Sequence, residues 1–429
     1  MKKQNFESYS LLANSSWPRF RANSGSTGKS SYSGPDGEEI IWESKIGNFS
    51  GEPAIDPDGN IYIPLKSEEL VAISSDGKEL WRKSLIGYSG KPLRGITTPS
   101  IREDGSLITA ALRKVVCLEP SGEQRWEKII DGLPSAPNIG PQGTIYVSAW
   151  SIDWAGMYVI SPEGESIGCD DPKVKKGWRA GRFVSISPPS IDNEGNVYLP
   201  FRDNITHPEA YTWDPIDEVK EDYQYQCVVF DPEGNKLGRF YPHTRSFVYP
   251  TSVSINNKGW AHYLHASWPG LVCFTLDDIL TEKAKYNNKI QWSWDIFRDE
   301  DDDGNEGPAF RHKAAGYIAI LDENRVWFRT TKDLSSTNVI VQVDASEANT
   351  KDILNREVIR VSDKVDADPV IDCNDRLYIG TVKGKIHIVN SQGEGLRTID
   401  VGHPIISLVI GPDKSLVITT KDKHLCLVR

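Results

Sequence analysis

Paired cysteines, long apolar runs and an excess of positive charge are all missing from this chain of 429 residues. Its six cysteines include no adjacent pair and no CxxC pair, which argues against a disulfide framework. No apolar run approaches the roughly 18 residues of a membrane span, so no membrane partner is expected. The net charge of −11 argues against a nucleic-acid partner, because broad phosphate contact requires a field of Lys and Arg.

The beginning of the chain, MKKQNFESYSLL, also lacks the hydrophobic stretch of a secretion signal. Taking Met1 as the natural start, we predict a cytoplasmic protein. The cysteines agree with this prediction, because four of them lie among Val, Leu and Phe and are interpreted as small buried hydrophobes. These are Cys117, Cys227, Cys273 and Cys426, each in the expected third strand of a different repeat.

What the sequence does contain is a phrase that returns along its whole length. Residues 52–63 read EPAIDPDGNIYI, with two short apolar runs on either side of a turn, which predicts a tight β-hairpin. Counting looser copies, the phrase occurs eight times, at Glu52, Thr98, Ala136, Pro188, Pro250, Ala315, Asp368 and Ile406. We number these copies repeats 1 to 8.

A second hairpin usually follows the first, as in LVAISSDGKELW at residues 70–81. Four strands per unit, at spacings from about forty residues upward, are typical of a β-propeller blade. We therefore predict an all-β, eight-bladed β-propeller. Repeat 8 supplies three strands before the chain stops, and GEEIIW at residues 37–42 is expected to complete the last blade and remove its open edge. The alternative is seven blades plus a loose terminal hairpin.

Two regions follow from this prediction. Residues 1–33 are expected to form an N-terminal arm that packs on the propeller, since WPRFR at residues 17–21 is an aromatic cluster beside a proline; a disordered arm is the alternative. Residues 34–429 are expected to form a single propeller domain, because the repeat register is unbroken.

Three motifs together resemble the PQQ-like propeller repeat family: the Trp-Pro-x-Phe-Arg-x-Asn segment from Trp17 to Asn23, the P-x-I-x-x-x-G-x-[IVL]-Y hairpins, and the Asp-Gly-Lys-x-x-Trp corner from Asp76 to Trp81. The resemblance covers nearly the whole chain and implies the fold more strongly than the function. The family includes quinoprotein alcohol dehydrogenases and an outer-membrane assembly lipoprotein. Those dehydrogenases carry a disulfide between adjacent cysteines over the quinone, which this chain lacks, so PQQ is not expected. The lipoprotein's signal sequence and lipidated cysteine are not found here either.

The longest predicted loops all fall on one face. If the first strand of each blade descends along the central channel, the connections after strands two and four share an upper face, and these are longest in blades 3 to 6. Aromatic side chains there predict a small-molecule pocket, although large loops also need aromatics for their own packing. The candidate pocket residues are Trp154, Trp178, Trp213 and Trp268.

Four arginines precede inner strands by similar spacings, namely Arg94, Arg182, Arg245 and Arg311. A ring of guanidinium groups at the channel mouth would favour an anionic ligand, because the guanidinium fork matches carboxylate and phosphate. The alternative is local pairing with Asp153, Asp203 or Asp214.

Groups able to transfer protons lie beside these arginines. His243 and Tyr249 share one connection, His312 follows Arg311, and His403 precedes the inner strand of blade 8. We assign His243, Tyr249 and His312 as candidate acid–base groups and His403 as a candidate ligand contact. The alternative is that each is a structural, hydrogen-bonded residue.

One acidic loop has the alternating oxygen ligands and the glycine of a calcium loop. The candidate ligands are Asp299, Asp301, Asp303 and Asn305, but the twelfth position is Phe310 rather than Glu. A solvated acidic loop is the favoured interpretation, with Ca²⁺ as the alternative, and no cofactor is predicted to be required.

Two functions remain open from the sequence. The first is a binding or scaffold protein that holds an anionic small molecule or a protein partner on its upper face. The second is a cofactor-independent lyase, hydrolase or cyclase that uses Arg to hold an anionic substrate and His or Tyr for proton transfer. No Ser-His-Asp order, GxSxG or HExxH pattern is visible, so binding is favoured slightly.

Overall fold

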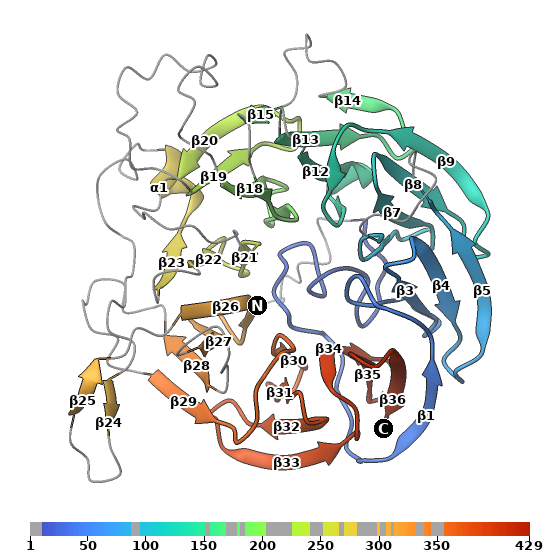
Figure 1. The fold of residues 1–429 in the computed structure, drawn as a ribbon. Helices are drawn as coiled ribbons and strands as arrows, with labels where there is room; N and C mark the ends of the chain where they lie inside the picture. Colours follow the sequence, from blue (N-terminus) through green and yellow to red (C-terminus); the bar gives the residue numbers. More distant parts are fainter. Residues whose placement is uncertain are drawn as a thin grey trace, which may run out of the picture.

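The computed structural model describes residues 11–86, 95–150, 155–168, 178–180, 185–202, 225–240, 252–265, 270–280, 298–300, 306–309, 313–331, 339–344 and 356–429. Their regular structure is almost entirely β-strand, and the sheets stand in a ring about a common centre (Figure 1). Within the described ranges only the helix α1 (Leu276–Leu280) and the 3-10 turn η2 (Pro141–Gly143) depart from this pattern. The chain has a β-propeller fold.

All eight repeats form the predicted antiparallel hairpin of an inner strand and a second strand, and the inner strand is short in every repeat except 6 and 8. Repeats 1 to 4 supply the hairpins β2 (Ala54–Ile55) with β3 (Ile61–Pro64), β6 (Ser100–Ile101) with β7 (Leu107–Ala111), β11 (Asn138–Ile139) with β12 (Ile145–Trp150), and β17 (Ser190–Ile191) with β18 (Val197–Arg202). Repeats 5 to 8 supply β21 (Ser254–Ile255) with β22 (Ala261–His265), β26 (Lys313–Ile320) with β27 (Arg325–Thr331), β30 (Val370–Ile371) with β31 (Leu377–Gly380), and β34 (Ile405–Gly411) with β35 (Ser415–Thr420).

Third and outer strands extend these hairpins into sheets. In repeats 1 to 4 they are β4 (Glu69–Ile73) and β5 (Glu79–Ser84), β8 (Lys114–Leu118) and β9 (Gln124–Ile129), β13 (Ala155–Ile160) and β14 (Ser166–Gly168), and β19 (Tyr225–Phe230) and β20 (Lys236–Phe240). In repeats 5 to 7 they are β23 (Gly270–Phe274), β28 (Val339–Asp344) and β29 (Arg356–Arg360), and β32 (Lys385–Val389) and β33 (Gly395–Asp400). Extra short strands are β10 (Leu133–Pro134), β15 (Trp178–Ala180) and β16 (Ser185–Ile186), and β24 (Arg298–Glu300) pairs with β25 (Glu306–Ala309) as a separate hairpin.

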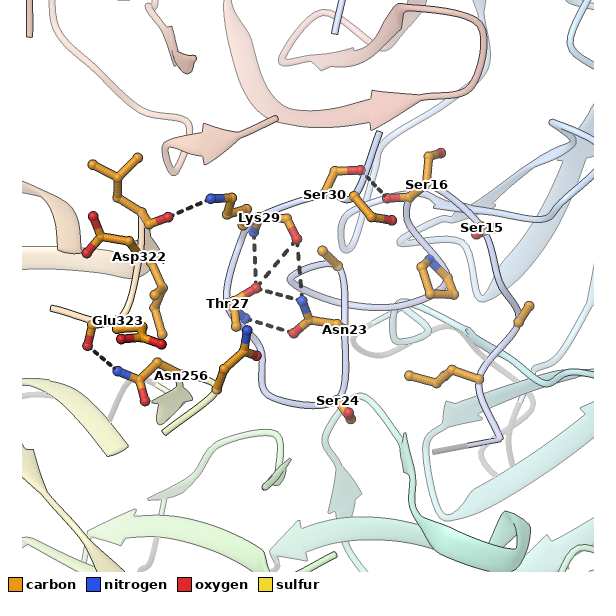
Figure 2. A pocket seen from close by; sticks show the side chains of 18 residues that line it. Ser15, Ser16, Asn23, Ser24, Thr27, Lys29, Ser30, Asn256, Asp322 and Glu323 are labelled. Atoms are coloured by element: carbon orange, nitrogen blue, oxygen red, sulfur yellow. Dashed lines mark hydrogen bonds between the residues drawn. The ribbon is translucent and has the colours of Figure 1, made fainter. Parts of the chain in front are cut away.

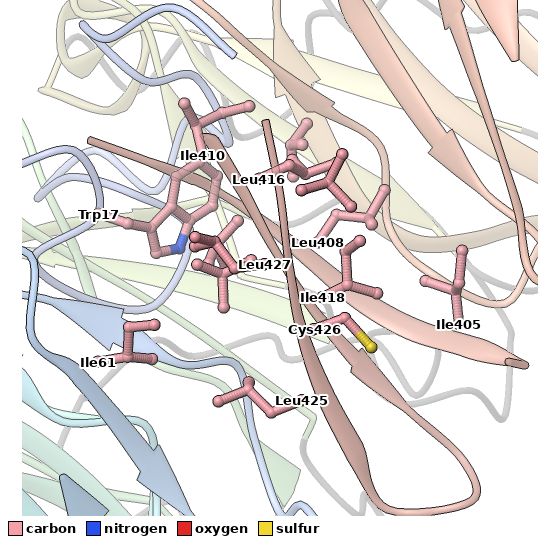
Figure 3. Close-up of a cluster of buried hydrophobic side chains, with 14 of the residues drawn as sticks. Trp17, Ile61, Ile405, Leu408, Ile410, Leu416, Ile418, Leu425, Cys426 and Leu427 are labelled. Atoms are coloured by element: carbon pink, nitrogen blue, oxygen red, sulfur yellow. The ribbon is translucent and has the colours of Figure 1, made fainter. Parts of the chain in front are cut away.

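The sheet of repeat 8 combines one strand from near the N-terminus with three strands from the C-terminus. Its third strand, β36 (His424–Val428), pairs antiparallel with β1 (Ile40–Lys45), so that Lys45 lies opposite His424. Figure 3 shows the apolar side chains of this sheet packed beside Trp17 and Ile61. The sequence predicted residues 37–42 as the partner of the C-terminal strands. The observed partner is β1, which overlaps that range.

Burial follows position in the ring. The second strands β3 and β7 are buried throughout, whereas the outer strands β1, β5 and β9 alternate between half-buried and exposed residues. This is expected when inner strands are covered on both faces by neighbouring sheets and outer strands meet water on one side. The third-strand cysteines Cys117, Cys227, Cys273 and Cys426 are buried and form no disulfide within the described ranges, which confirms their interpretation as small buried residues.

Tryptophans of the Asp-Gly-Lys-x-x-Trp corner join neighbouring sheets at the rim. Trp81 Nε1 donates to Pro120 O in the next sheet at 2.7 Å, and its indole lies against Gly122, where a Cβ atom would come within 2.8 Å of the ring. Trp42 makes the same contact with Ser75 O at 2.9 Å. The corner motif is therefore a joint between sheets rather than a feature of one hairpin.

Candidate functional site

Residues 11–35, which include the described part of the predicted N-terminal arm, lie at the centre of the ring (Figure 1). From here on, the arm means residues 11–35. Its carbonyl groups accept hydrogen bonds from the last residue of the inner strand in six sheets. The pairs are Ile55 N to Trp17 O, Ile101 N to Pro18 O, Ile191 N to Ser24 O, Ile255 N to Gly25 O, Ile320 N to Thr27 O and Ile371 N to Gly28 O, at 2.8–2.9 Å. Inner strands form the edge of each sheet, and a buried edge amide needs a partner. The arm supplies one for each of these sheets.

Side chains on the inner strands complete this polar ring. Ser100 Oγ donates to Pro137 O, Asn138 Nδ2 donates to Pro189 O, and Ser190 Oγ donates to the carbonyl of Val253. Each of these bonds therefore runs from one sheet to the next.

The corresponding carbonyls of repeats 6 and 7, Ile318 O and Pro369 O, accept from the arm instead, with Arg21 Nη2 at 2.9 Å from each. Arg21 thus does for these two sheets what Ser100, Asn138 and Ser190 do for the sheets that follow them.

Arg21 also belongs to a buried charged pair. Its backbone N–H donates to Glu52 Oε2 at 3.0 Å, and its Nη1 lies 3.7 Å from Glu52 Oε1. Burial raises the pKa of the Glu52 carboxyl, and the charge of Arg21 opposes that rise. Gly28 makes the arrangement sterically feasible, because a Cβ atom there would stand 2.0 Å from Arg21 Nη2.

A second pair stands nearby on the sheets of repeats 6 and 7. Asp368 Oδ1 accepts from Arg329 Nε and from the backbone N–H of Tyr317, each at 3.0 Å. The Tyr317 ring packs edge-on against Phe20, with centroids 4.9 Å apart. Unlike the fully buried Arg21 side chain, those of Arg329 and Asp368 keep 15% and 16% of their surface exposed, so this pair can be reached from solvent.

Arg19 is the other buried cation of the arm. It bonds Asn23 O at 2.5 Å, Ser26 Oγ at 3.0 Å and Pro137 O at 3.5 Å, and within the described part of the chain it forms no ion pair. Burial lowers the pKa of its guanidinium to about 9, with Glu52 acting in the opposite direction. Its neighbours are carbonyl and hydroxyl groups of the arm and of one inner strand, so Arg19 shapes the turn of the arm.

A cavity of about 350 Å³ lies between the arm and the turns that follow the inner strands of repeats 5 and 6. Figure 2 shows its polar side chains bonded to one another, with Asn23 joined to Thr27, and Lys29 Nζ donating to Leu321 O at 2.5 Å. Asn256 Nδ2 donates to Glu323 O at 2.6 Å. This cavity lies on the side of the inner-strand turns, opposite to the face on which the sequence predicts a pocket.

Most residues of the predicted upper-face site fall outside the ranges that the structure describes. These are Arg94, Arg182, Arg245, Arg311, Trp154, Trp213, Trp268, His243, Tyr249 and His312, together with Asp301, Asp303 and Asn305 of the acidic loop. Trp178 lies in β15, which pairs with β13, and Asp299 lies in β24.

His403 is the one predicted site residue whose side-chain surroundings are described. It lies just before β34 and contacts Glu43 and Asp422, beside His424. These groups belong to the sheet that β1 shares with β36, so the described contacts of His403 are with the rim of that sheet.

Arg19, Arg21, Glu52 and Asp368 were missed as site residues by sequence reasoning. The repeat contained a usable signal, because Glu52 and Asp368 both stand immediately before the proline of the P-x-I phrase, where other copies have Thr98, Ala136 and Pro188. Two acids at a position that faces the centre require cations; Arg21 of WPRFR pairs with Glu52, and Arg329 pairs with Asp368.

The fold has clear counterparts among solved structures. BamB from Moraxella catarrhalis is 12% identical, with 91% of this chain and 97% of that chain covered at a TM-score of 0.57. The quinohemoprotein alcohol dehydrogenase from Comamonas testosteroni is also 12% identical, with 97% and 81% covered at a TM-score of 0.61. The C-terminal WD40 domain of Sif2 is 10% identical, with 91% and 97% covered at a TM-score of 0.55.

Identities this low establish the β-propeller fold and nothing finer. The likeness to BamB and to the quinohemoprotein dehydrogenase confirms the PQQ-like resemblance at the level of fold. No protein-family model matches the sequence, and a search of curated proteins finds no match. Of the helices in the described ranges, none is long and apolar enough to cross a membrane.

Proposed function

We propose that this protein is a binding or scaffold protein that holds an anionic small molecule at the upper face of an eight-bladed propeller, over blades 3 to 6. The observation that carries the proposal is the arm at the centre of the ring. Its carbonyl groups bond to the inner strands of six sheets. A ligand would therefore approach from the opposite, upper side, where the longest connections of the sequence lie.

The eight-blade count and the closure of the ring belong to the same proposal. The pairing of β1 with β36 supports closure, because it joins Ile40–Lys45 to the C-terminal strand of repeat 8. A rigid closed disc is a suitable platform for a binding site made of loops, since the scaffold holds the loop ends in place.

Charge on the described wall supports an anionic ligand. Near the centre three guanidinium groups, those of Arg19, Arg21 and Arg329, stand beside two carboxylates, Glu52 and Asp368. In this proposal Arg94, Arg182, Arg245 and Arg311 would add to that positive field, and paired N–H donors of Arg match carboxylate and phosphate.

The test begins with the purified protein. Native mass spectrometry would detect a co-purified anion, and calorimetric titration with inorganic phosphate and with citrate would measure binding of two simple probes. Arg245→Met and Arg311→Met are expected to weaken binding about 10- to 100-fold, because a hydrogen bond to a charged group contributes roughly 1.5–3 kcal/mol.

Arg125→Met is the matched control, since Arg125 pairs with Glu119 and Asp104 at the rim. Unchanged affinity in both upper-face variants would contradict the proposed site. A second outcome would favour the enzyme alternative over the binding function. In that outcome the protein converts a bound compound chemically, and His243→Gln or His312→Gln abolishes the conversion.

A further inference from the structure

Two histidines and a glutamate converge on the rim of the sheet of repeat 8, in which β1 pairs with β36. Glu43 comes from β1, His424 begins β36, and His403 precedes β34. Their donor atoms all lie within 4.8 Å of one another. His403 Nε2 is 3.1 Å from Glu43 Oε1, and the same oxygen contacts His424 Nδ1. The two imidazole rings stack with centroids 4.2 Å apart.

Backbone contacts hold these donors in place. Val401 N donates to Gly384 O at 2.7 Å and Lys421 N donates to Pro404 O at 2.8 Å, on either side of His403. Gly384, at φ +83°, packs so tightly on His403 that a Cβ atom would stand 2.6 Å from the backbone nitrogen of His403. Ile46 N donates to Lys423 O at 2.9 Å, which fixes the end of β1 beside the start of β36.

Asp422 orients one of the two rings. Its Oδ2 accepts from His403 Nδ1 at 2.6 Å, while its Oδ1 accepts from Thr420 Oγ1 at 2.6 Å. With the proton on Nδ1, the Nε2 lone pair of His403 points at the Glu43 carboxylate. Metal-binding histidines commonly have such a carboxylate on their other nitrogen, which sets the tautomer and the ring orientation.

Two ring nitrogens and a carboxylate oxygen face one another. Each ring nitrogen either donates an N–H to the carboxylate or presents its lone pair to a cation. The competing occupant is a proton, and the hydrogen bond to Asp422 raises the pKa of His403. A metal ion takes the lone pairs of all three donor atoms at once, whereas the proton-bound state needs a separate N–H donor on each ring.

We propose that Glu43, His403 and His424 form a binding site for a divalent transition-metal ion of the Zn²⁺ class, with Asp422 as the positioning residue. Two imidazoles and a carboxylate are a known zinc ligand set that leaves a fourth position open. With Zn–N bonds of about 2.0–2.1 Å, tetrahedral ligands stand about 3.3 Å apart. The 3.1 Å between His403 Nε2 and Glu43 Oε1 fits this spacing, whereas the shorter contact of His424 Nδ1 with the same oxygen must open when an ion binds. The side chains are 21–32% exposed, so the open position faces water.

Such an ion would bind the two ends of the chain together. Glu43 and His424 are 381 residues apart in sequence, and a metal that binds only the folded protein stabilises it by mass action. The site is independent of any ligand on the upper face and would stand if that proposed function failed.

Zn²⁺ titration of chelator-treated full-length protein tests the site. The background is Cys373→Ser, because Cys373 is an exposed thiol that could itself bind zinc. We expect one saturable site per chain, a higher Tm with Zn²⁺, and visible absorption bands of a low-coordinate Co²⁺ complex. His403→Gln, His424→Gln and Glu43→Gln should each lower the affinity at least 10-fold and abolish the Zn²⁺-dependent Tm shift. Asp422→Asn should cost about 10- to 100-fold while keeping the Co²⁺ bands.

His387→Gln is the matched control, since His387 lies on β32 with its Nδ1 on Thr398 Oγ1, outside the cluster. It should bind Zn²⁺ like the background protein. Metal-free Tm values and far-UV circular dichroism show whether each variant folds. The proposal is overturned if the background protein has no saturable site up to 100-fold molar excess of Zn²⁺. Equal binding by folded His403→Gln and His424→Gln proteins would overturn it as well.

Discussion

The N-terminal segment makes two junctions with the body of the protein, and they differ in kind. At the centre, the arm places Trp17, Arg19 and Arg21 in fully buried positions and exchanges backbone hydrogen bonds with one sheet after another. At the rim, β1 adds to β36 as a half-exposed edge strand. The first junction satisfies buried polar groups, and the second extends a sheet.

The difference shows where single substitutions should matter. A buried charge that loses its partner keeps its whole desolvation penalty, whereas an exposed pair is replaced by water at little cost. We therefore expect large effects at the centre and small effects at the rim. Four experiments test this contrast, from the largest expected effect to the smallest.

Arg21→Met should be the most destabilising change, lowering the free energy of unfolding by about 3–5 kcal/mol. It would leave Glu52 buried without its cation and would remove the donor to Ile318 O and Pro369 O. Urea unfolding followed by tryptophan fluorescence measures the loss. The double variant Arg21→Met/Glu52→Gln should recover part of it, because no buried carboxylate remains; equal losses in the single and double variants would contradict the charge argument.

Acid should destabilise the folded protein through a buried histidine beside the arm. His262 is buried with Nδ1 3.3 Å from Ser254 O, and Ser254 Oγ donates to Ser26 O of the arm. Burial lowers the pKa of His262 to about 4, so between about pH 6.5 and 4 the unfolded chain binds more protons, and stability falls as the pH falls. The contribution reaches about 3 kcal/mol at the acid end.

His262→Phe should remove that part of the pH dependence of Tm. His387→Phe is the graded comparison, because burial also lowers the pKa of His387 but that ring is only half-buried. A slope unchanged by His262→Phe would show that this histidine does not carry the acid sensitivity.

Gly28→Ala should be more destabilising than Gly259→Ala by about 1–3 kcal/mol. Both glycines have positive φ, +65° and +76°, so both variants carry the backbone strain. Only at Gly28 would the new methyl group meet Arg21, since nothing lies within 4 Å of a Cβ atom at Gly259. Thermal unfolding of the two variants measures the difference in stability. Equal Tm values would mean that Arg21 and the arm move to accommodate the methyl group without loss of stability.

Trp42→Phe and Trp81→Phe compare the rim junction with an internal joint. Each removes one indole donor, to Ser75 O and to Pro120 O respectively, and each should cost about 1 kcal/mol. Similar losses in chemical unfolding would mean that β1 is held like any other outer strand. A loss at Trp81 with none at Trp42 would show that the terminal joint opens before the others.

Sequence reasoning predicted the hairpins well because their signals are local. Apolar alternation and an Asp, Asn or Gly turn lie within twelve residues of each other, as in EPAIDPDGNIYI, and the carboxylate of Asp56 explains the pattern by accepting from both Asn60 and Tyr62. The site was harder to predict, because its signals are distributed. Glu52 and Arg21 are 31 residues apart, and no local pattern pairs them.

His403 illustrates the same limit. Sequence reasoning placed it at the upper mouth as a ligand contact, and its three described neighbours, Glu43, Asp422 and His424, come from both ends of the chain. Only a register between strands that are distant in sequence brings those residues together.

The sequence by itself determined that this protein is built from repeated antiparallel hairpins, with buried thiols and a tryptophan at several outer corners. Those features depend on neighbours in the chain and on the alternation of apolar residues. Only the tertiary structure decided that the arm becomes the lining of the centre and that Arg21 serves two sheets at once. The reason is physical: the unpaired inner-strand amides and carbonyls that the arm satisfies exist only after the ring has formed.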